Sequence, residues 1–218
     1  MSGAVAETLA LLDWKRTVFQ LYADVRTSSP EAGWQRWRET RDRLFGTHPQ
    51  SPLPAAARER FDGLRYFPYD PSLRLLAAVE EAPREHVAIA ALEGAVSFER
   101  IARARVALGG QDCTLDLYWL DAYGGGLFLP FADATSGHET YGAGRYLLDT
   151  VKGADLGMDG DRLVLDLNFA YNPSCAYDPA WVCPLAPAEN RLSPAVRGGE
   201  LAPSPSVSPY ATEVPRWH

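Results

Sequence analysis

The sequence is poor in cysteine, in lysine and in long apolar runs, and each shortage excludes a class of protein. No apolar run approaches the ~20 residues that a bilayer-spanning helix needs, so we expect no membrane span. The cysteines, Cys113, Cys175 and Cys183, are odd in number, which argues against a disulfide framework. No two of them have the short spacing of a zinc knuckle, so no metal site is predicted.

The start of the chain and its charge exclude further classes. The opening stretch MSGAVAETLALLDWKR lacks the basic start of a secretory signal peptide, and Glu7 and Asp13 interrupt its apolar part. We therefore expect a cytoplasmic protein. The net charge of −7 argues against nucleic acid, because phosphate binding needs clustered positive charge. We expect no nucleic-acid partner, no membrane partner and no cofactor, and the sequence leaves the oligomeric state open.

The first part of the chain has helical periodicity. Apolar residues recur at helical spacing over residues 4–27. Ser29 followed by Pro30 predicts the start of a second helix, which runs to about Phe45. Trp34 and Trp37 lie on the stripe of that helix that also holds Arg41, Leu44 and Phe45, so core packing is a better interpretation for them than a ligand cage. A short helix is expected in PAAARERF, and YFPYDPSLR is an irregular connector.

From Leu73 onward the apolar period changes from 3.6 to 2, which predicts strands. ALGGQD and DAYGGGL are typical of hairpin loops. Because no long helix interrupts the strands, the sheet should be mostly antiparallel, and a sheet of this size curls into a barrel-like form or a sandwich. The predicted class is α+β, with N-terminal helices packed on the curled sheet. The predicted strands are LRLLAAVEE, HVAIAAL, SFERIARARVAL, CTLDLYWL, GLFLPF and RLVLDLNF.

We predict one globular domain over residues 1–200. Its helical part covers residues 1–62 and its β-rich part covers residues 73–198. Residues 201–218 are dominated by proline and serine, which is typical of a disordered tail or a strap on the surface. We expect this tail to make few core contacts.

Residues 131–192 form a block unusually rich in polar residues. In RLVLDLNF, strand alternation places Asp166 and Asn168 on the same face, between Val164 and Ala170. A buried aspartate needs a positive partner or several donors, and Arg145 is the best candidate, because GRYLL can form the neighbouring strand. Two interpretations fit equally well: a buried ion pair that stabilises the fold, and a polar ligand held by Arg145 and oriented by Asp166 and Asn168.

Other motifs in the block have simpler explanations. TYGAGRY contains G-x-G, but it lacks the rest of a phosphate-binding fingerprint, so turn or bulge glycines are favoured. His138 could be a general base, although a single histidine in a loop is more often simply exposed. Cys175 could be a nucleophile, but the sequence places no partner for it, which favours a buried structural thiol.

Several motifs in order along the chain resemble one family. They are RDRLFGTHPQSPL, FDGLRYFPYD, FADATSGHETYGAGRYL, LDLNFAYNPSCAY and CPLAPAENRL. Together they resemble the bacterial and archaeal domain-of-unknown-function family 1684, over most of residues 10–200. The chain departs from the family pattern at His138 and Glu139, where a small polar residue is usual. The resemblance implies no particular reaction; it implies motif positions at Asp133, Thr135, Tyr141, Gly144, Arg145, Asp166, Asn168, Tyr171, Asn172, Cys175, Cys183, Glu189 and Asn190.

The sequence thus leads to a predicted site and three rival functions. AYNPSCAY, residues 170–177, is expected to be an ordered, buried loop that walls a pocket, because Pro173 holds Asn172 in extended geometry. The first hypothesis is a small-molecule site in residues 131–192, with acid/base or hydrolytic chemistry. The second is a binding barrel without catalysis, and the third is a structural or interaction domain. The candidate catalytic residues are Asp166 and Glu189, and the candidate ligand-binding residues are Arg145, Asn168, Tyr171, Asn172, Tyr141 and Asn190.

Overall fold

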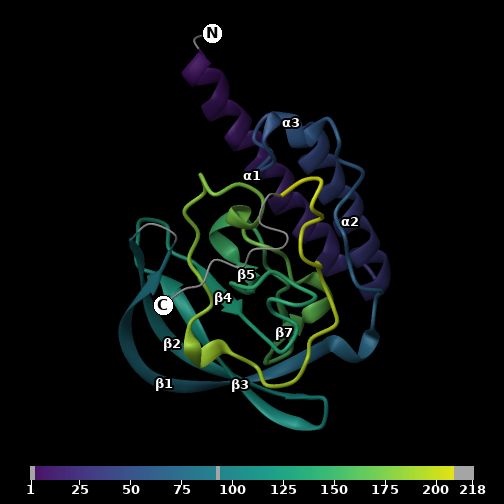
Figure 1. The fold of residues 1–218 in the computed structure, drawn as a ribbon. Helices are drawn as coiled ribbons and strands as arrows, with labels where there is room; N and C mark the ends of the chain where they lie inside the picture. The colour runs from purple at the N-terminus through teal and green to yellow at the C-terminus, as the bar shows by residue number, and fades with distance from the viewer. Residues whose placement is uncertain (1–2, 92–93, 209–218) are drawn as a thin grey trace.

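A computed structural model describes residues 3–91 and 94–208 of the chain, and it begins with a pair of long helices (Figure 1). Helix α1 (Gly3–Thr27) and helix α2 (Pro30–Thr47) agree with the predicted helices. Pro30 starts α2, where its fixed φ angle suits the first helical position. The helices pack through buried aromatic residues, and the Trp37 indole N–H donates to the Tyr22 hydroxyl at 3.0 Å. No helix in the described ranges has the length and hydropathy that crossing a lipid bilayer requires.

The remaining helices of the described residues are short. The single turn α3 (Ala55–Arg58) follows Pro54 and falls inside the predicted PAAARERF helix. Short 3-10 helices also occur: one directly precedes a strand, two directly follow strands, and two lie in the chain after the last strand. They are η1 (Pro71–Leu73), η2 (Thr150–Lys152), η3 (Leu167–Phe169), η4 (Ser174–Ala176) and η5 (Ala188–Asn190).

The strands of the described residues form one seven-stranded antiparallel sheet in the order β5-β4-β3-β2-β1-β7-β6. Strands β1 to β3 are long and strongly curved, and the sheet bends around the core with the helices on one side (Figure 1). The α+β class and the curled antiparallel sheet are therefore confirmed. The strands are β1 (Arg74–Ala90), β2 (Ala95–Leu108), β3 (Gln111–Leu120), β4 (Leu127–Phe131), β5 (Arg145–Asp149), β6 (Met158–Asp159) and β7 (Arg162–Asp166).

Strand β1 differs from the prediction of two separate strands. It continues through Pro83, and its register with β2 shifts between Glu81 and Glu85. A bulge of this kind lets a strand absorb a proline, which has no N–H to give to the ladder. The proline therefore bends β1 instead of ending it.

The sheet curls until β5 approaches the chain that follows β7. Tyr146 of β5 and Tyr171 form an isolated antiparallel bridge, with N–H···O distances of 2.8 and 2.9 Å. The expectation that GRYLL lies next to the strand of Asp166 was wrong, because β7 pairs with β1 and β6. The bridge nevertheless brings β5 to the AYNPSCAY loop, so that Tyr146 and Tyr171 line the same pocket.

The core is shared by the helices and the sheet. One cluster of buried residues includes Tyr22, Trp34 and Trp37 of the helices together with Leu115 and Leu165 of the sheet. Trp37 is fully buried, so the prediction that it packs in the core is confirmed. The predicted boundaries at residues 62, 73, 198 and 200 remain predictions.

Residues 201–208 differ from the expectation of few core contacts. Val207 is buried in a cluster with Tyr141 and Cys175. The Ser208 hydroxyl donates to the Ala176 carbonyl at 2.8 Å. Residues 209–218, the rest of the predicted tail, lie outside the described residues. The first part of the tail is thus a strap packed on the AYNPSCAY region.

Candidate functional site

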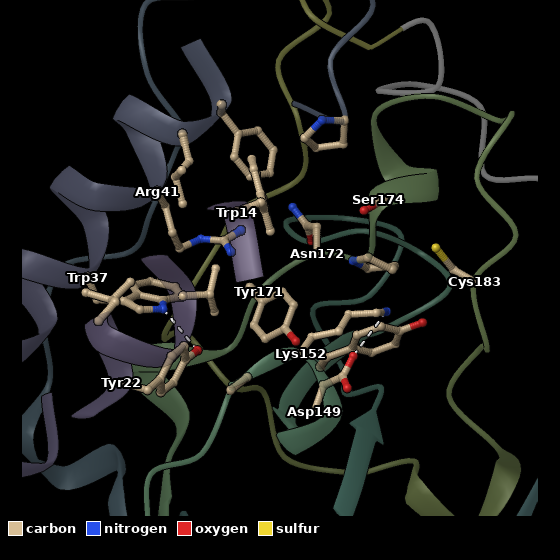
Figure 2. A pocket seen from close by; sticks show the side chains of 18 residues that line it. Trp14, Tyr22, Trp37, Arg41, Asp149, Lys152, Tyr171, Asn172, Ser174 and Cys183 are labelled. Atoms are coloured by element: carbon tan, nitrogen blue, oxygen red, sulfur yellow. Dashed lines mark hydrogen bonds and ion pairs between the residues drawn. The ribbon is translucent and has the colours of Figure 1, made fainter. Parts of the chain in front are cut away.

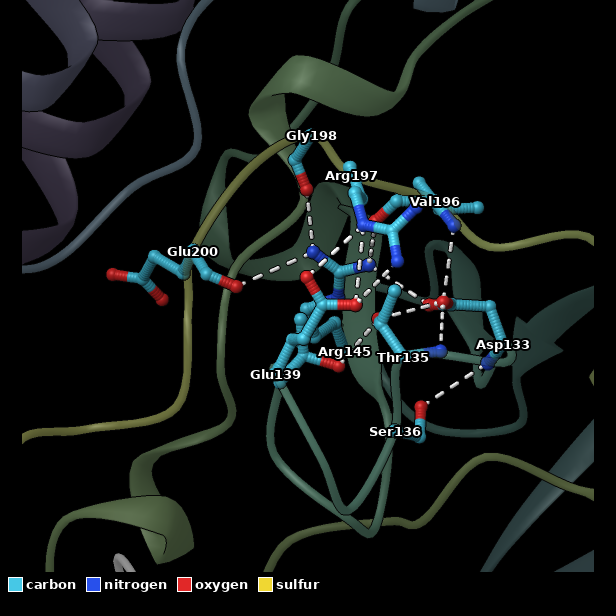
Figure 3. Close-up of polar contacts among 10 residues, drawn as sticks. Asp133, Thr135, Ser136, Glu139, Arg145, Val196, Arg197, Gly198 and Glu200 are labelled. Atoms are coloured by element: carbon cyan, nitrogen blue, oxygen red, sulfur yellow. Dashed lines mark hydrogen bonds and ion pairs between the residues drawn. The ribbon is translucent and has the colours of Figure 1, made fainter.

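Arg145 is the centre of a buried clamp, and its partner is Asp133 (Figure 3). Its guanidinium donates to the Asp133 carboxylate at 2.8 Å and to the Val196 carbonyl at 3.0 Å, and also to the carbonyls of Gly198 and Glu200. Both side chains of the ion pair are almost fully buried. Burial lowers the pKa of the Arg145 guanidinium, and the Asp133 charge opposes that shift.

The predicted Arg145–Asp166 pair was wrong. Asp133 also accepts hydrogen bonds from the Thr135 N–H at 2.8 Å and the Val196 N–H at 3.1 Å, so the clamp joins the loop after β4 to the segment at residues 196–200. Sequence reasoning missed Asp133 as the partner because β5 pairs with β4, the strand that leads into Asp133. Both terminal nitrogens of the Arg145 guanidinium are thus bound by groups of the protein itself, which is what a fold-stabilising clamp requires.

Asp166 and Asn168 do lie together, but as part of a turn. Strand β7 ends at Asp166, whose carboxylate accepts from the Asn168 N–H at 3.1 Å and its amide at 2.8 Å. The Asn168 side chain also holds both backbone groups of Asp70, at 2.7 and 2.9 Å. Burial raises the pKa of Asp166, against these hydrogen bonds. The pair thus ties β7 to the connector that precedes β1.

Asp166 also lines a small polar pocket between α1 and β7, with a cavity volume of about 240 Å³. The arginines of this pocket already have carboxylate partners. Arg26 lies 3.6 Å from Asp155, and Arg74 lies 3.9 Å from Asp159. The pocket therefore presents the Asp166 carboxylate, while both of its arginines are already paired with other carboxylates and are poorly placed to bind an acidic ligand.

Asn190 and Glu189 are neighbours with different roles. Asn190 is fully buried, and its side-chain amide connects β3 to β4. The amide accepts from the Asp116 N–H of β3 at 2.7 Å and donates to the Pro130 carbonyl of β4 at 2.8 Å. Glu189 is exposed on η5, which contacts β3. Asp166 is the last residue of β7, and strands β1 and β2 lie between β7 and β3 in the sheet order. Asp166 lines the pocket between α1 and β7, and Glu189 is not among the lining residues of that pocket.

The AYNPSCAY loop walls a pocket, as predicted (Figure 2). The loop is ordered and mostly buried, and Tyr171 to Ser174 face the space between α1, α2 and the sheet. The cavity volume is about 100 Å³, whereas one water molecule needs roughly 10–15 Å³. We call it the aromatic pocket. Its lining residues are Trp14, Val18, Leu21, Tyr22, Trp37, Arg41, Leu44, Phe45, Pro52, Tyr146, Asp149, Lys152, Ala154, Tyr171, Asn172, Pro173, Ser174 and Cys183.

Arg41 supplies a half-buried cation at one wall of the aromatic pocket. Its guanidinium lies 4.9 Å from the ring centres of Trp37 and Tyr171, which is within cation–π range. It also forms an ion pair with Glu200 at 2.7 Å. Burial raises the pKa of the Glu200 carboxyl, against the effect of Arg41. Glu200 in turn accepts from the Asn172 N–H, so the cation is fixed to the loop.

Asn172 lines the same pocket and carries a buried acceptor. Its amide N–H groups donate to the Leu201 carbonyl at 2.8 Å and to the Tyr177 hydroxyl at 3.4 Å. Its Oδ1 is buried and has no hydrogen-bond partner among the residues that the structure describes. Across the pocket, Lys152 and Asp149 form an ion pair at 3.2 Å (Figure 2). The pocket therefore combines aromatic walls with a few polar groups.

Sequence reasoning identified part of the aromatic pocket. Tyr171 and Asn172 were predicted, whereas Arg41 and Lys152 were missed, as was Glu200, which pairs with Arg41. An arginine on the apolar stripe of a helix was the available signal for Arg41. Tyr141, a predicted ligand-binding residue, packs against Cys175 in the core and lies outside the set of lining residues.

These features define an α+β protein with a curled antiparallel sheet and an aromatic pocket between the sheet and its N-terminal helices. The chain belongs to the family described as protein of unknown function (DUF1684), whose model matches residues 59–201. It is similar to an uncharacterized protein from gene locus rrnAC0354 of Haloarcula marismortui, known from a solution NMR structure. The two are 34% identical with a TM-score of 0.56, over 78% of this chain and 93% of that chain. No curated protein matches the chain significantly.

Proposed function

We propose that the protein binds a small organic molecule in the aromatic pocket. The supporting observation is the buried Asn172 Oδ1, which lacks a hydrogen-bond partner among the described residues, beside the aromatic walls of the pocket. Leaving a buried acceptor unpaired costs about 1–3 kcal/mol, so a ligand donor that reaches it gains binding energy. The ligand class is a flat apolar ring that carries an N–H or O–H donor.

Binding without catalysis fits the carboxylates better than acid/base chemistry does. Neither Asp166 nor Glu189 lines the aromatic pocket. Asp149 does, but it is paired with Lys152 at 3.2 Å. The proposal keeps the expected cytoplasmic location, which suits the free thiols Cys113, Cys175 and Cys183.

The first test uses benzamide, a ring with an amide N–H, as the probe. Ligand-observed NMR measures its binding to the protein and to Val18→Phe, which places a larger side chain into the pocket from α1. Val5→Phe, at an exposed position of the same helix, is the matched control. We expect benzamide to bind the protein and the control, and to lose most of its affinity for Val18→Phe at an unchanged melting temperature. Equal binding by the two variants, or no binding at all, would overturn the proposal.

A second test separates binding from carboxylate chemistry. Asp166→Asn and Glu189→Gln are expected to bind benzamide as the unaltered protein does, because both positions lie outside the pocket lining. Loss of binding in both variants would instead indicate that the ligand binds at Asp166 and Glu189, in the polar block at residues 131–192. Native mass spectrometry of the protein purified from its own cells then identifies any natural ligand that co-purifies.

A further inference from the structure

Two thiols meet at the wall of the aromatic pocket. Cys175 lies in η4, and its backbone N–H donates to the Cys183 sulfur at 3.4 Å. Both cysteines belong to the same cluster of buried residues. Both cysteines are buried and free. The 3.4 Å contact brings the Cys183 sulfur to the backbone of Cys175, so a disulfide between the two cysteines requires only local movement of the chain.

The two thiols differ in their access to the pocket. Cys183 is among the lining residues, and Figure 2 shows its sulfur near Ser174. Cys175 belongs to the same buried cluster but is not among the lining residues, and the Tyr141 hydroxyl is 3.9 Å from its sulfur. Lys152 lines the same pocket as Cys183. A small molecule in the pocket would therefore contact Cys183 and not Cys175.

We propose that Cys183 and Cys175 form a redox-active dithiol, which a small hydroperoxide entering the aromatic pocket oxidises to a disulfide. Cys183 is the attacking thiol and Cys175 is the resolving thiol. The proposal uses the same pocket as the proposed function but rests on the thiols, so failure to bind benzamide would not overturn it.

The electrostatics assign the two roles in this order. The neighbouring Cys175 thiol lowers the pKa of Cys183 against the effect of burial, and the Cys175 N–H and the Lys152 charge add to this lowering. The Cys183 thiol, together with burial, raises the pKa of Cys175. Cys183 is thus the thiol that loses its proton first, and the thiolate is the reactive form of cysteine.

The chemistry balances in two steps. The Cys183 thiolate attacks one peroxide oxygen, an S–O bond forms, the O–O bond breaks, and the second oxygen leaves as hydroxide, which becomes water on taking up a proton. The Cys175 sulfur then attacks the Cys183 sulfur, an S–S bond forms, the S–O bond breaks, and water leaves with the Cys175 proton. Two thiols and one hydrogen peroxide therefore give one disulfide and two waters. Two molecules of a small thiol, or one dithiol, reduce the protein disulfide by exchange: both Cys175 and Cys183 recover their protons as thiols, and the reductant leaves as its own disulfide.

The experiment treats the full chain with hydrogen peroxide and counts the remaining thiols. Cys113→Ser is the matched control, because Cys113 lies on β3 in a different buried cluster. We expect the protein and this control to lose two thiols and about 2 Da per chain, and to recover both with dithiothreitol. Peptide mapping should recover a fragment in which Cys175 is linked to Cys183.

Two variants test the order of attack. Cys175→Ser should stop at a sulfenic acid on Cys183, which dimedone traps, and Cys183→Ser should give neither product. Peptide mapping of the unaltered chain needs no variant, so it decides the matter even if a serine variant unfolds. The proposal is wrong if the mapped chain shows no Cys175–Cys183 fragment at peroxide doses that oxidise free cysteine, or if Cys183 passes directly to its sulfonic acid.

Discussion

At the scale of single residues, Arg145 carries the largest expected effect on stability. Arg145→Met would leave Asp133 charged, buried and without its cation, while the carbonyls of Val196 and Gly198 lose their donor. Removing one partner of a buried ion pair typically costs about 3–5 kcal/mol. We therefore expect the free energy of unfolding, measured by urea denaturation, to fall by about that amount.

Arg197→Met provides the matched control for Arg145. Arg197 forms an ion pair with Glu139 at 2.9 Å, but its side chain is 64% exposed, so water replaces the partner readily. We expect no measurable change in its unfolding. If both variants lost the same stability, or if Arg145→Met lost none, the clamp would not be the fold-stabilising element that its contacts indicate.

At the scale of elements, the strap at residues 201–208 is expected to stabilise the AYNPSCAY region. A chain that ends after Glu200 loses the burial of Val207 and the hydrogen bond between the Asn172 amide and the Leu201 carbonyl. Burying a valine side chain is worth about 1.5–3 kcal/mol, and a hydrogen bond adds about 1 kcal/mol. We expect this truncation to lower the melting temperature by roughly 5 °C or more.

A chain that ends after Ser208 keeps all the contacts described for the strap and serves as the reference for the truncation. Scanning calorimetry of the two chains compares them directly. Equal melting temperatures would mean that the strap lies on the surface with little energetic effect, as its proline and serine content first indicated.

At the scale of the whole molecule, the shared core predicts a single unfolding transition. Trp34 and Trp37 report on the contact between the helices and the sheet, since both belong to the cluster that also holds Leu115 and Leu165. Tryptophan fluorescence and far-UV circular dichroism should therefore give the same urea midpoint. Two separated midpoints would show that the helical part, residues 1–62, and the β-rich part unfold independently.

The sequence by itself determined most of the helices and strands and one segment of the pocket wall. Ser29 and Pro30 mark the start of α2, and the period-2 pattern marks the strands, because both signals depend on residues that are near neighbours in the chain. Pro173 and the polar residues around it predicted a buried, ordered loop at a pocket for a similarly local reason. The antiparallel sheet followed from the lack of long helices between strands.

The tertiary structure alone decided which distant groups meet. Arg145 pairs with Asp133 because β5 lies beside β4, and Asp166 lies at the other side of the sheet order, beside β1. Arg41 reaches Glu200 across most of the chain, and Cys175 meets Cys183 because the intervening loop folds back. Strand order and sheet curvature set these pairings, and both result from the packing of the whole core, so no local pattern of residues contains them.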